Sequence, residues 1–571
     1  FFSKACTSMS GEKACQRGAT ESTACSNDGG RQEPPPPPKV PDDGGKRCPW
    51  QHQPSPPRSS KKELGCWSSV FAVVGSAFRW SAKRHWLATR SSATPVADAL
   101  LEALSEQRRR PEGALDLVGM RLRRDPGRRV DEAYEVVRCL GRGSCGTVYE
   151  AHSMRTGGRY ALKTREKVKK AAKASMRAEV EALIRLNHPN VVKLCDFFED
   201  MDSISMVTEL CDAGDFMQLM HGPSSQSGEI RAVFRDVMLA VSYCHAAGVV
   251  HRDLKPANCL LVAGPSRRVG KVADFSIAVI RHGHHAECSL RGRCGSWLFM
   301  APEVIGGWEY GSQCDLWSLG VMLYMLFARQ HPFLQEPDTC STKQLMHDIC
   351  AADFRSQPLE ATTSGDPGIM HLVCRLLERD PDDRIDARQA LEHCWLRDEA
   401  SEASSCMQAE VLRRLTDFAC LPLVGRALRI AMAQTIAGPD VEAAREAFLA
   451  LDRCHEGALR RAQLAAALAA RGAVVDFDRL FSALDMDRSG AVEWLEWLAA
   501  ALPQDAVQSE QAIQELFASF DREGTGMISE SDLAQIVGDD EAQRVFECAG
   551  VAGGVLDVEA FGRLVVDATA P

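Results

Sequence analysis

The sequence predicts a multidomain protein: an α+β domain followed by an all-α domain of repeated helix–loop–helix units, with a disordered N-terminal region in front. Three observations support this fold class. At 571 residues, the chain is too long for a single hydrophobic core. From Tyr134, strand-like runs give way to long helical patterns that end near Trp395. After Pro439, helix–loop–helix patterns recur about every 28–36 residues, as in a chain built from small repeated units.

Charge is distributed unevenly along the chain, behind a net value of −10. Residues 1–130 carry 22 Lys and Arg against 13 Asp and Glu, whereas residues 436–571 carry 25 acidic side chains against 10 Arg and no Lys. The basic surplus suggests an anionic partner such as a membrane surface, although a solvated, disordered arm is the favoured interpretation. The acidic surplus fits cation binding. No nucleic-acid partner is expected, and we expect a monomer.

The N-terminal region, residues 1–130, is predicted to be largely disordered. Its polyproline run at Pro34–Pro38 lies among Gly, Ser, Lys and Asp residues that cannot form a core. The stretch from Cys66 to Leu87 mixes Trp and Phe with Arg and Lys. This composition fits a basic amphipathic helix on a membrane and equally a short helix packed on the next domain, so both interpretations stay open.

Cysteine usage and hydropathy point to a cytoplasmic protein. The 22 cysteines are scattered without the spacing of a disulfide framework, which favours a reducing compartment. No stretch approaches the roughly 18 apolar residues that a transmembrane helix needs. The chain opens with Phe1 rather than Met, and we expect the natural start, with any lipidation signal, to lie upstream. Peripheral membrane contact through the basic N-terminal region is left open.

A glycine-rich run between two apolar strands is the first motif with chemical meaning. It contains Gly141, Gly143 and Gly146, followed by Val148. Glycine is needed where backbone N–H groups approach phosphate oxygens closely. A plain turn or a dinucleotide-binding loop would read similarly, but a strand rather than a helix follows, which argues against dinucleotide binding.

The next charged residues occur in an order that suits phosphoryl transfer. Lys163 follows on a strand and supplies a cation for the α- and β-phosphates, and Glu179 on a predicted helix can pair with it. Asp253 can orient the attacking hydroxyl and accept its proton, while Lys255 can neutralise the γ-phosphoryl group. Mg²⁺ can be held by the Asn258 amide and the Asp274 carboxylate, which opens the run Asp-Phe-Ser. Three further motifs follow: Ala301-Pro302-Glu303, Asp315-Leu316-Trp317-Ser318 and Arg384.

Residues 134–396 resemble the protein-kinase family on these motifs. The resemblance implies a bilobal fold, with a small β-rich lobe, a larger helical lobe and ATP between them. It also implies a buried ion pair between Glu303 and Arg384. The resemblance places Thr208 as gatekeeper, Glu209 to Cys211 as the hinge facing adenine, and Asp215 near the ribose. Arg252 before Asp253 is associated with control through the activation segment, and Lys255 marks serine/threonine specificity.

Two positions depart from the family pattern. Ser276 stands where the metal-binding triplet usually ends in Gly, so we expect altered switching with the Asp274 carboxylate intact. Ala257 replaces an acidic residue that commonly reads a basic substrate side chain, which weakens the expectation of a basic-residue preference. The activation segment is rich in His282, His284, His285, Cys288 and Cys294. Zinc is one interpretation, but the spacing matches no standard site, and a basic, mobile loop is favoured. Ser289 and Ser296 are candidate phosphorylation sites in the same segment.

The clearest metal motif lies in the acidic C-terminal region. An EF-hand loop needs oxygen ligands at positions 1, 3, 5 and 9, a backbone carbonyl at 7, Gly at 6 and a bidentate carboxylate at 12. The run 485–496 meets every requirement. Its predicted Ca²⁺ ligands include Asp485, Asp487, Ser489, the Ala491 carbonyl and Glu496.

A second loop, 521–532, is predicted to bind Ca²⁺ or Mg²⁺ weakly, because it ends in Asp, whose shorter side chain reaches a large cation less readily. Its candidate ligands are Asp521, Glu523, Thr525, the Met527 carbonyl and Asp532. Loops 452–463 and 549–560 have lost ligands: the first has Cys454 at position 3 and Gln463 at position 12. We expect both to serve as structural partners, since EF-hands fold in pairs.

The connector at 400–436 has a basic amphipathic helical pattern, which suits the apolar groove of an EF-hand. A helix packed on the kinase domain is the alternative, and it is compatible as a resting state. Across about residues 134–566 the chain resembles the calcium-dependent protein kinases of plants and alveolates.

This resemblance implies a kinase domain (134–396), an autoinhibitory junction (400–436) and a calmodulin-like domain with four EF-hand units (437–571). The junction would block the substrate site until Ca²⁺ binding frees it, and Ser/Thr residues of proteins would be phosphorylated. The rival interpretations are a calcium-binding pseudokinase scaffold and a kinase that responds to separate calmodulin.

Overall fold

The computed structural model describes residues 129–570 with internal gaps, so expectations for residues 1–128 lie outside the described residues. The described residues all belong to one compact unit, Ala82–Pro571. The gaps are 144–145, 167–169, 201, 222–226, 282–289, 335–341, 364–365, 398–408, 437, 471, 473–474, 522–523, 538 and 550–553. Among the helices described, there is none with the length and apolar character needed to cross a membrane.

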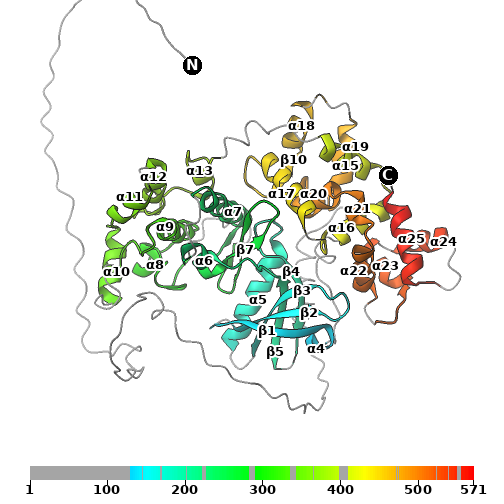
Figure 1. The fold of residues 1–571 in the computed structure, drawn as a ribbon, viewed down its shortest axis with the longest axis horizontal. Coiled ribbons are helices and arrows are strands. Elements are labelled where there is room, and N and C mark those ends of the chain that lie inside the picture. The colour runs from blue at the N-terminus through cyan, green and yellow to red at the C-terminus, as the bar shows by residue number, and fades with distance from the viewer. Residues whose placement is uncertain are drawn as a thin grey trace, which may run out of the picture. The chain divides into compact units, whose positions relative to one another are not determined.

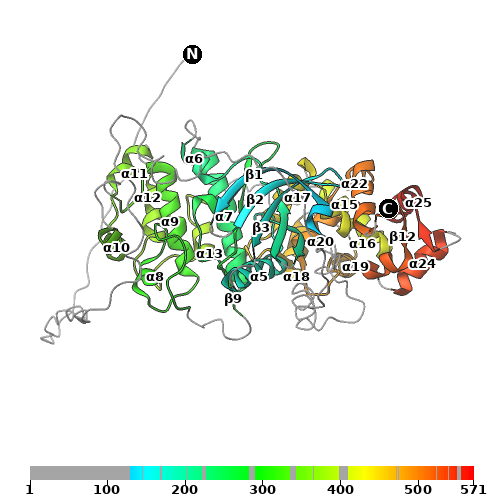
Figure 2. The same cartoon turned by 90° about the horizontal axis from the view of Figure 1, so that it is seen from below.

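A five-stranded antiparallel sheet with strand order β1-β2-β3-β5-β4 forms the first lobe (Figure 1). Leu162 of β3 pairs with Val207 of β5, and both side chains are buried, so one face of the sheet is apolar and covered. Helix α5 packs against β3, β4 and β5 (Figure 2). The elements are α4 (Val130–Ala133), β1 (Tyr134–Gly143), β2 (Gly146–Ser153), β3 (Arg159–Glu166), α5 (Lys170–Arg185), β4 (Leu194–Glu199) and β5 (Ser203–Glu209).

The second lobe is mainly helical and contributes most of the largest hydrophobic cluster. Helix α9 is buried along nearly its whole length, as expected for a helix that is apolar on every side. The helices are α6 (Phe216–His221), α7 (Ser227–Ala246), η1 (Pro256–Asn258), α8 (Pro302–Gly306), α9 (Gln313–Ala328), α10 (Thr342–Ala351), α11 (Gln357–Thr362), α12 (Pro367–Leu376) and α13 (Ala387–Leu391). Short antiparallel pairs join β6 (Val249–Val250) to β9 (Val279–Ile280) and β7 (Cys259–Ala263) to β8 (Arg268–Val272). The expected small β-rich lobe and larger helical lobe are thus both present.

Residues 409–570 form helix–loop–helix units around a second hydrophobic cluster. Two short antiparallel pairs, β10–β11 and β12–β13, join neighbouring loops. The elements are α17 (Pro439–Leu451), β10 (Ala458–Arg460), α18 (Arg461–Ala470), α19 (Phe477–Leu484), β11 (Ala491–Glu493), α20 (Trp494–Ala501), α21 (Gln504–Val507), α22 (Glu510–Phe520), β12 (Ile528–Ser529), α23 (Glu530–Val537), α24 (Asp539–Ala549), β13 (Val555–Leu556) and α25 (Val558–Thr569).

The connector forms two helices, α15 (Ala409–Cys420) and α16 (Leu423–Ala433), that pack inside this second cluster. Helix α15 buries an apolar stripe of Val411, Leu415 and Phe418 against α19 and α20, and α16 packs against α20, α22 and α25. Arg429 belongs to the basic amphipathic pattern of the connector, and its side chain is buried. Its guanidinium donates to the carbonyls of Ala499 at 3.0 Å and of Leu502 at 2.5 Å, at the end of α20.

Candidate active site and cation-binding loops

The glycine-rich run forms the hairpin between β1 and β2. Gly141 pairs with Val148, and Gly143 pairs with Gly146. Gly146 has a φ of 126°, and a Cβ there would lie 2.7 Å from the Thr164 carbonyl oxygen, so a larger residue would disturb the packing of β2 on β3. The close approach of two strand backbones explains why the hairpin needs glycine at this point.

Lys163 on β3 lies between two carboxylates. Its Nζ donates to both oxygens of Glu179 on α5, at 2.7 and 2.8 Å, and to Oδ1 of Asp274 at 2.8 Å. Burial lowers the pKa of Lys163, but the two carboxylates outweigh that effect and the pKa is raised, so the ammonium stays charged. Burial also raises the pKa of Glu179 to about 7, against the opposing effect of Lys163. The pairing of Lys163 with Glu179 expected from sequence is present.

The segment that links the two lobes begins at the end of β5. Thr208 is buried and pairs with Ala161 of β3, and Glu209 ends the strand. The Glu209 carboxylate accepts hydrogen bonds from Lys271 Nζ at 2.9 Å and from the Lys193 backbone at 2.8 Å. It therefore ties the linking segment to both lobes.

Two residues complete the segment that links the lobes. Burial raises the pKa of the Cys211 thiol, which keeps it protonated. Asp215 accepts from the Gln218 backbone at 3.1 Å, so its carboxylate stabilises the first turn of α6.

The loop between β6 and β7 brings Asp253, Lys255 and Asn258 together. Lys255 Nζ lies 2.5 Å from Asp253 Oδ2, and the Ser296 backbone N–H donates to Asp253 Oδ1 at 2.7 Å. The Asn258 side-chain nitrogen donates to the Asp253 carbonyl at 2.8 Å, which leaves the amide oxygen as the atom suited to a cation. A carboxylate, an ammonium and an amide therefore lie on one loop.

This loop is held by a buried carboxylate on α9 whose supporting role the sequence analysis missed. The Asp315 oxygens accept from the backbone N–H groups of His251 and Arg252 at 2.9 and 2.8 Å, and His245 Nε2 lies 2.9 Å away. Burial raises the pKa of Asp315, but the His245 and His251 contacts outweigh it and lower the pKa. The signal was an acidic residue inside an otherwise apolar helix, since such residues are rarely buried without partners.

Asp274 lies beside this loop, since the neighbouring Ala273 backbone N–H donates to the Asn258 carbonyl at 2.9 Å. Its own φ is 64°, in the left-handed region. Burial raises its pKa, but Lys163 and a hydrogen bond from the Ser276 side chain lower it, and the net shift is downward. The Ser276 carbonyl accepts from Ser175 Oγ on α5 at 2.7 Å. Where the sequence suggested only a loss of backbone freedom, Ser276 also links the Asp274 carboxylate to α5.

Three hydrogen bonds fix the segments around Asp253. Arg252 donates to the Ile277 carbonyl at 2.8 Å and to Tyr310 Oη at 3.2 Å, and Tyr310 donates to the Gly292 carbonyl at 3.1 Å. The predicted buried pair of Arg384 and Glu303 is confirmed, with contacts of 2.7 and 3.1 Å.

Most of the histidine- and cysteine-rich activation segment, residues 282–289, lies outside the described residues. Cys294, which is described, has its Sγ 3.3 Å from Tyr310 Oη. The zinc interpretation therefore stays untested. Ser296 is described and contacts Lys255 at 3.1 Å.

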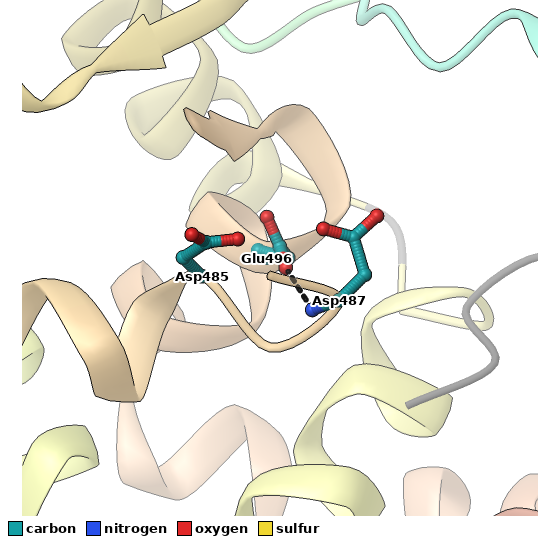
Figure 3. Close-up of side chains that lie close together, drawn as sticks. All are labelled: Asp485, Asp487 and Glu496. Carbon is teal, nitrogen blue, oxygen red and sulfur yellow. Dashed lines mark hydrogen bonds between the residues drawn. The ribbon is translucent and has the colours of Figure 1, made fainter. Parts of the chain in front are cut away.

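The loop at 485–496 brings three carboxylates together (Figure 3). Ligand atoms of Asp485, Asp487 and Glu496 all lie within 4.8 Å of one another, and within the described part of the chain this is the one such group of three. Glu496 is fully buried; its Oε1 accepts from the Met486 and Asp487 backbones at 2.7 and 3.2 Å. Burial, together with Asp487 and Glu493, raises the pKa of Glu496 well above its ordinary value. Converging oxygens that repel one another suit a hard cation such as Ca²⁺.

The remaining predicted ligands of this loop follow the same plan. Asp485 accepts from the backbones of Ser489 at 2.9 Å and Gly490 at 3.0 Å, which folds the loop around its first position. Ser489 Oγ donates to the Ala491 carbonyl at 2.9 Å. Both oxygens therefore lie close to the carboxylate group.

The loop at 521–532 repeats only half of this geometry. Asp521 accepts from the Thr525 and Gly526 backbones at 2.9 and 2.7 Å. Asp532 accepts from the backbone and hydroxyl of Ser529, at 2.9 and 2.6 Å. Its short arm therefore stays within its own half of the loop. The Met527 carbonyl accepts from Thr525 Oγ1 at 3.1 Å, and Glu523 lies outside the described residues.

The loop at 452–463 keeps its shape without a full ligand set. Asp452 accepts from the Glu456 and Gly457 backbones at 3.2 and 2.7 Å, whereas Gln463 at position 12 accepts from the Arg460 backbone at 2.8 Å. In the loop at 549–560, residues 550–553 lie outside the described part. Its strand β13 pairs with β12 of the neighbouring loop.

Comparison with known proteins agrees with this arrangement. A family model described as "Protein kinase domain" matches residues 134–396. Calcium-dependent protein kinase 7 of Arabidopsis thaliana is 30% identical over 428 residues, covering 73% of this chain and 78% of the relative. Calcium-dependent protein kinase 33 of Arabidopsis thaliana is 29% identical over 409 residues (70% and 77%). Calcium-dependent protein kinase 2 of Zea mays is 28% identical over 413 residues (71% and 79%).

A bilobal fold that pairs a buried lysine with a glutamate and an aspartate, and carries a second aspartate on a loop with lysine and asparagine, is that of a protein kinase. The chain is an enzyme of the protein serine/threonine kinase class. Enzymes of this class use ATP and Mg²⁺ and act on protein substrates. The similarity to curated relatives runs well beyond the matched domain. The chain belongs to the calcium-dependent protein kinase family.

Proposed function

We propose that this chain is activated by Ca²⁺ binding to its own C-terminal region and transfers the ATP γ-phosphate to Ser and Thr hydroxyls of proteins. The single observation that carries the calcium part is the convergence of Asp485, Asp487 and Glu496 in one loop. The proposed organisation is a basic N-terminal region (1–130), a kinase domain (134–396), a junction (400–436) and a calmodulin-like EF-hand domain (437–571).

In the proposed catalytic mechanism, Asp253 orients the substrate hydroxyl and accepts its proton. The 2.5 Å contact with Lys255 keeps that carboxylate beside a cation that neutralises the transferred group. Lys163 binds the α- and β-phosphates, and Glu179 positions it. Asn258 and Asp274 would hold Mg²⁺, which supplies charge neutralisation at the phosphates when bound. Because Lys163 already contacts both Glu179 and Asp274, the pairings that activity requires are present in this conformation.

The ATP-binding residues proposed here follow the same cleft. The Gly141, Gly143 and Gly146 hairpin would cover the phosphates, with Val148 beside the base. Thr208, Glu209 and Cys211 would line the adenine side, and Asp215 would lie near the ribose. The end of β5 and the start of α6, where these residues lie, support this assignment.

For calcium, the proposed ligands of the main site are Asp485, Asp487, Ser489, the Ala491 carbonyl and Glu496. A weaker site would use Asp521, Glu523, Thr525, the Met527 carbonyl and Asp532. The buried, mutually repelling carboxylates of the main loop support this order of affinity, because a divalent cation would relieve their repulsion.

We further propose that the junction acts as the regulatory switch. Without Ca²⁺ it would occupy the substrate site, and with Ca²⁺ the EF-hand domain would hold it. The shared hydrophobic core of α15 and α16 with the helix–loop–helix units supports the second of these states, because the stripe of Val411, Leu415 and Phe418 is already enclosed.

The proposed setting is a cytoplasmic monomer that acts on proteins and not on nucleic acid. Peripheral membrane contact would come from the basic N-terminal region, where residues 1–130 carry a surplus of Lys and Arg. Vesicle co-sedimentation of the full chain with anionic and neutral lipids tests this. Equal recovery on both surfaces would remove the membrane proposal.

The proposed function is tested by measuring phosphate transfer by the purified chain across a calcium titration. We expect activity to rise with Ca²⁺ in the absence of added calmodulin, and Asp274→Ala to abolish turnover at every calcium concentration while the protein stays folded. Undiminished transfer by Asp274→Ala would refute the assigned metal ligand. Flat activity across the titration would refute calcium control, and a response only after addition of calmodulin would favour an external sensor.

The pseudokinase alternative is disfavoured by the intact inventory of charged groups. Lys163, Glu179, Asp253, Asn258 and Asp274 are all retained and lie within contact distance of their expected partners. Ser276, which departs from the family pattern, donates to Asp274 and supports its ionised form. A radiolabel transfer assay separates the two alternatives directly.

A further inference from the structure

The loop at 452–463, which lacks a full calcium ligand set, contacts the kinase domain directly. Ser242 Oγ on α7 donates to the His455 carbonyl at 3.1 Å. Gly457 lies against the Tyr243 ring so closely that a Cβ at this position would be 2.2 Å from Tyr243 Cδ2. His455 and Gly457 both have positive φ values, 53° and 72°. The bend that an ion-binding loop requires is therefore used here to fit a kinase helix.

A buried ion cluster lies next to this contact. Arg445 on α17 pairs with Glu442 at 2.5 Å and with Asp236 of α7 at 3.2 Å. The Arg445 and Asp236 side chains are only 4% and 3% exposed. Asp236 also accepts from Arg267 at 2.6 Å and from the Gly270 backbone at 3.0 Å. Removing one member of such a buried cluster is costly, unlike breaking a surface pair, so the contact joins the two regions firmly.

The same loop is joined to the main cation loop. Strand β10 pairs with β11, with Ala458 opposite Glu493 and Leu459 opposite Val492. Glu493 in turn accepts a hydrogen bond from Asn187 Nδ2 of the kinase domain at 3.2 Å. Any change in the cation loop that moves β11 therefore reaches both β10 and Asn187.

The kinase side of this contact leads to the active site. The Asn187 backbone donates to Tyr243 Oη at 2.7 Å. Asn187 therefore contacts both Glu493 and Tyr243, and the Tyr243 ring in turn packs against Gly457. Asn187 follows the end of α5 at Arg185 by two residues, and α5 carries Glu179, the partner of Lys163. A continuous set of contacts thus runs from the cation loop to the helix that positions the phosphate-binding lysine.

We propose that the loop at 452–463, together with Arg445 of α17 and Glu493 of β11, is a docking surface for the kinase domain. Its partner is the surface formed by Asn187, Asp236, Ser242 and Tyr243 of the same chain. The loop keeps Asp452 and Gly457 because they shape the dock, while Cys454 and Gln463 are free of the demands of ion binding. Through β10 and β11 the dock transmits the state of the main cation loop to α5. This inference rests on the proposed calcium regulation.

A matched pair of glycine variants tests the dock in the full chain. Gly457→Ala places a methyl group against Tyr243, whereas Gly472→Ala has no heavy atom within 4 Å. The two positions have similar backbone strain, with φ of 72° and 65°. We expect Gly457→Ala to lower the calcium-stimulated rate at least about fivefold, within the range of measured coupling between sites. Activity without calcium and Ca²⁺ binding at 485–496 should stay unchanged, and Gly472→Ala should behave as the parent chain.

Hydrogen exchange gives a second readout that requires no calcium response. Exchange at the Asn187 amide should be faster in Gly457→Ala than in Gly472→Ala, because the bond to Tyr243 depends on the docked ring. If Gly457→Ala does not fold, Arg445→Gln replaces it. Equal calcium stimulation and equal exchange in the two glycine variants would overturn the docking proposal. A parent chain that transfers no phosphate or ignores calcium would instead count against the proposed function, so the two failures are distinguishable.

Discussion

The loops at 485–496 and 452–463 have nearly the same backbone and different side-chain chemistry. In both, the first Asp accepts from the glycine N–H at position 6, at 3.0 Å in one loop and 2.7 Å in the other. Both have positive φ at position 4, 55° at Arg488 and 53° at His455. Both contribute a strand to the same antiparallel pair.

The difference lies at positions 3 and 12. Glu496 reaches back to the Met486 and Asp487 backbones and brings its carboxylate to the centre of the loop. Gln463 instead accepts from the Arg460 backbone, at the start of its own helix. Loop shape therefore depends on the Asp–Gly bonds and the strand pair, while the proposed ion binding would depend on which side chain closes the loop. A loop can lose one property and keep the other.

The largest expected effect follows from removing the closing carboxylate of the main loop. Glu496→Gln keeps the shape of the side chain but removes its charge. We expect Ca²⁺ affinity at 485–496 to fall at least about 100-fold. Loss of a residue that only supports a metal ligand already lowers affinity by up to about 100-fold, and Glu496 is itself a proposed ligand. Calorimetric titration measures the affinity, and Glu559→Gln on the exposed face of α25 is the control. An unchanged calcium response in Glu496→Gln would show that the main sensor lies elsewhere.

The next prediction concerns restoring ligands at positions 3 and 12 of the loop at 452–463. Cys454→Asp with Gln463→Glu completes positions 3 and 12 beside the existing Asp452 and Glu456. We expect one additional bound ion per chain, with lower affinity than at 485–496, because ion binding must compete with the contact between Gly457 and the kinase domain. Calorimetry gives the ion count. No extra ion up to about 1 mM Ca²⁺, the weak limit for such loops, would contradict the idea that the backbone remains competent.

Much of the catalytic site could be predicted from sequence because each group lies on a short, locally ordered run. Asp253, Lys255 and Asn258 share one loop, so their spacing alone brings them together. The pairing of Lys163 with Glu179 was also predictable. In the protein-kinase fold, a lysine on a strand pairs with a glutamate on the helix that follows it. The order of strands before helices followed from the change of hydrophobic period along the chain, and the two lobes followed from the resemblance to protein kinases.

What sequence reasoning missed depends on contacts between distant segments. Asp315 supports the loop from α9, sixty-three residues beyond Arg252. Arg429 belongs to the basic amphipathic pattern of the connector, but its guanidinium is buried and donates to the carbonyls of Ala499 and Leu502 at the end of α20. Neither partner is visible in a local pattern, because a helical period reports which side is apolar and not which buried polar group lies opposite.

A smaller effect is expected from lengthening the closing residue of the loop at 521–532. Asp532→Glu adds one methylene, which lets the carboxylate leave Ser529 and approach the first half of the loop, as Glu496 does in its own loop. We expect Ca²⁺ affinity there to rise about tenfold through bidentate closure. Asp557→Glu, at a helix start outside the ligand set, is the matched control. The comparison fails if both changes alter calcium binding equally.

The smallest effect concerns the first carboxylate of the loop that has lost its ion ligands. Burial raises the pKa of Asp452 to about 6, above the value near 4 of an unfolded chain. The folded state therefore binds more protons between about pH 4 and 6, and stability falls as the pH rises through that window. Asp452→Asn removes this dependence, so its stability relative to the parent should improve by up to about 3 kcal/mol between pH 4 and 7. Calorimetric unfolding at both pH values measures the difference, and calcium should not change it.

In Asp485→Asn the corresponding gain in stability should appear only without calcium, since the bound ion depends on that charge. A pH-independent difference between Asp452→Asn and the parent would show that the dock leaves Asp452 solvated.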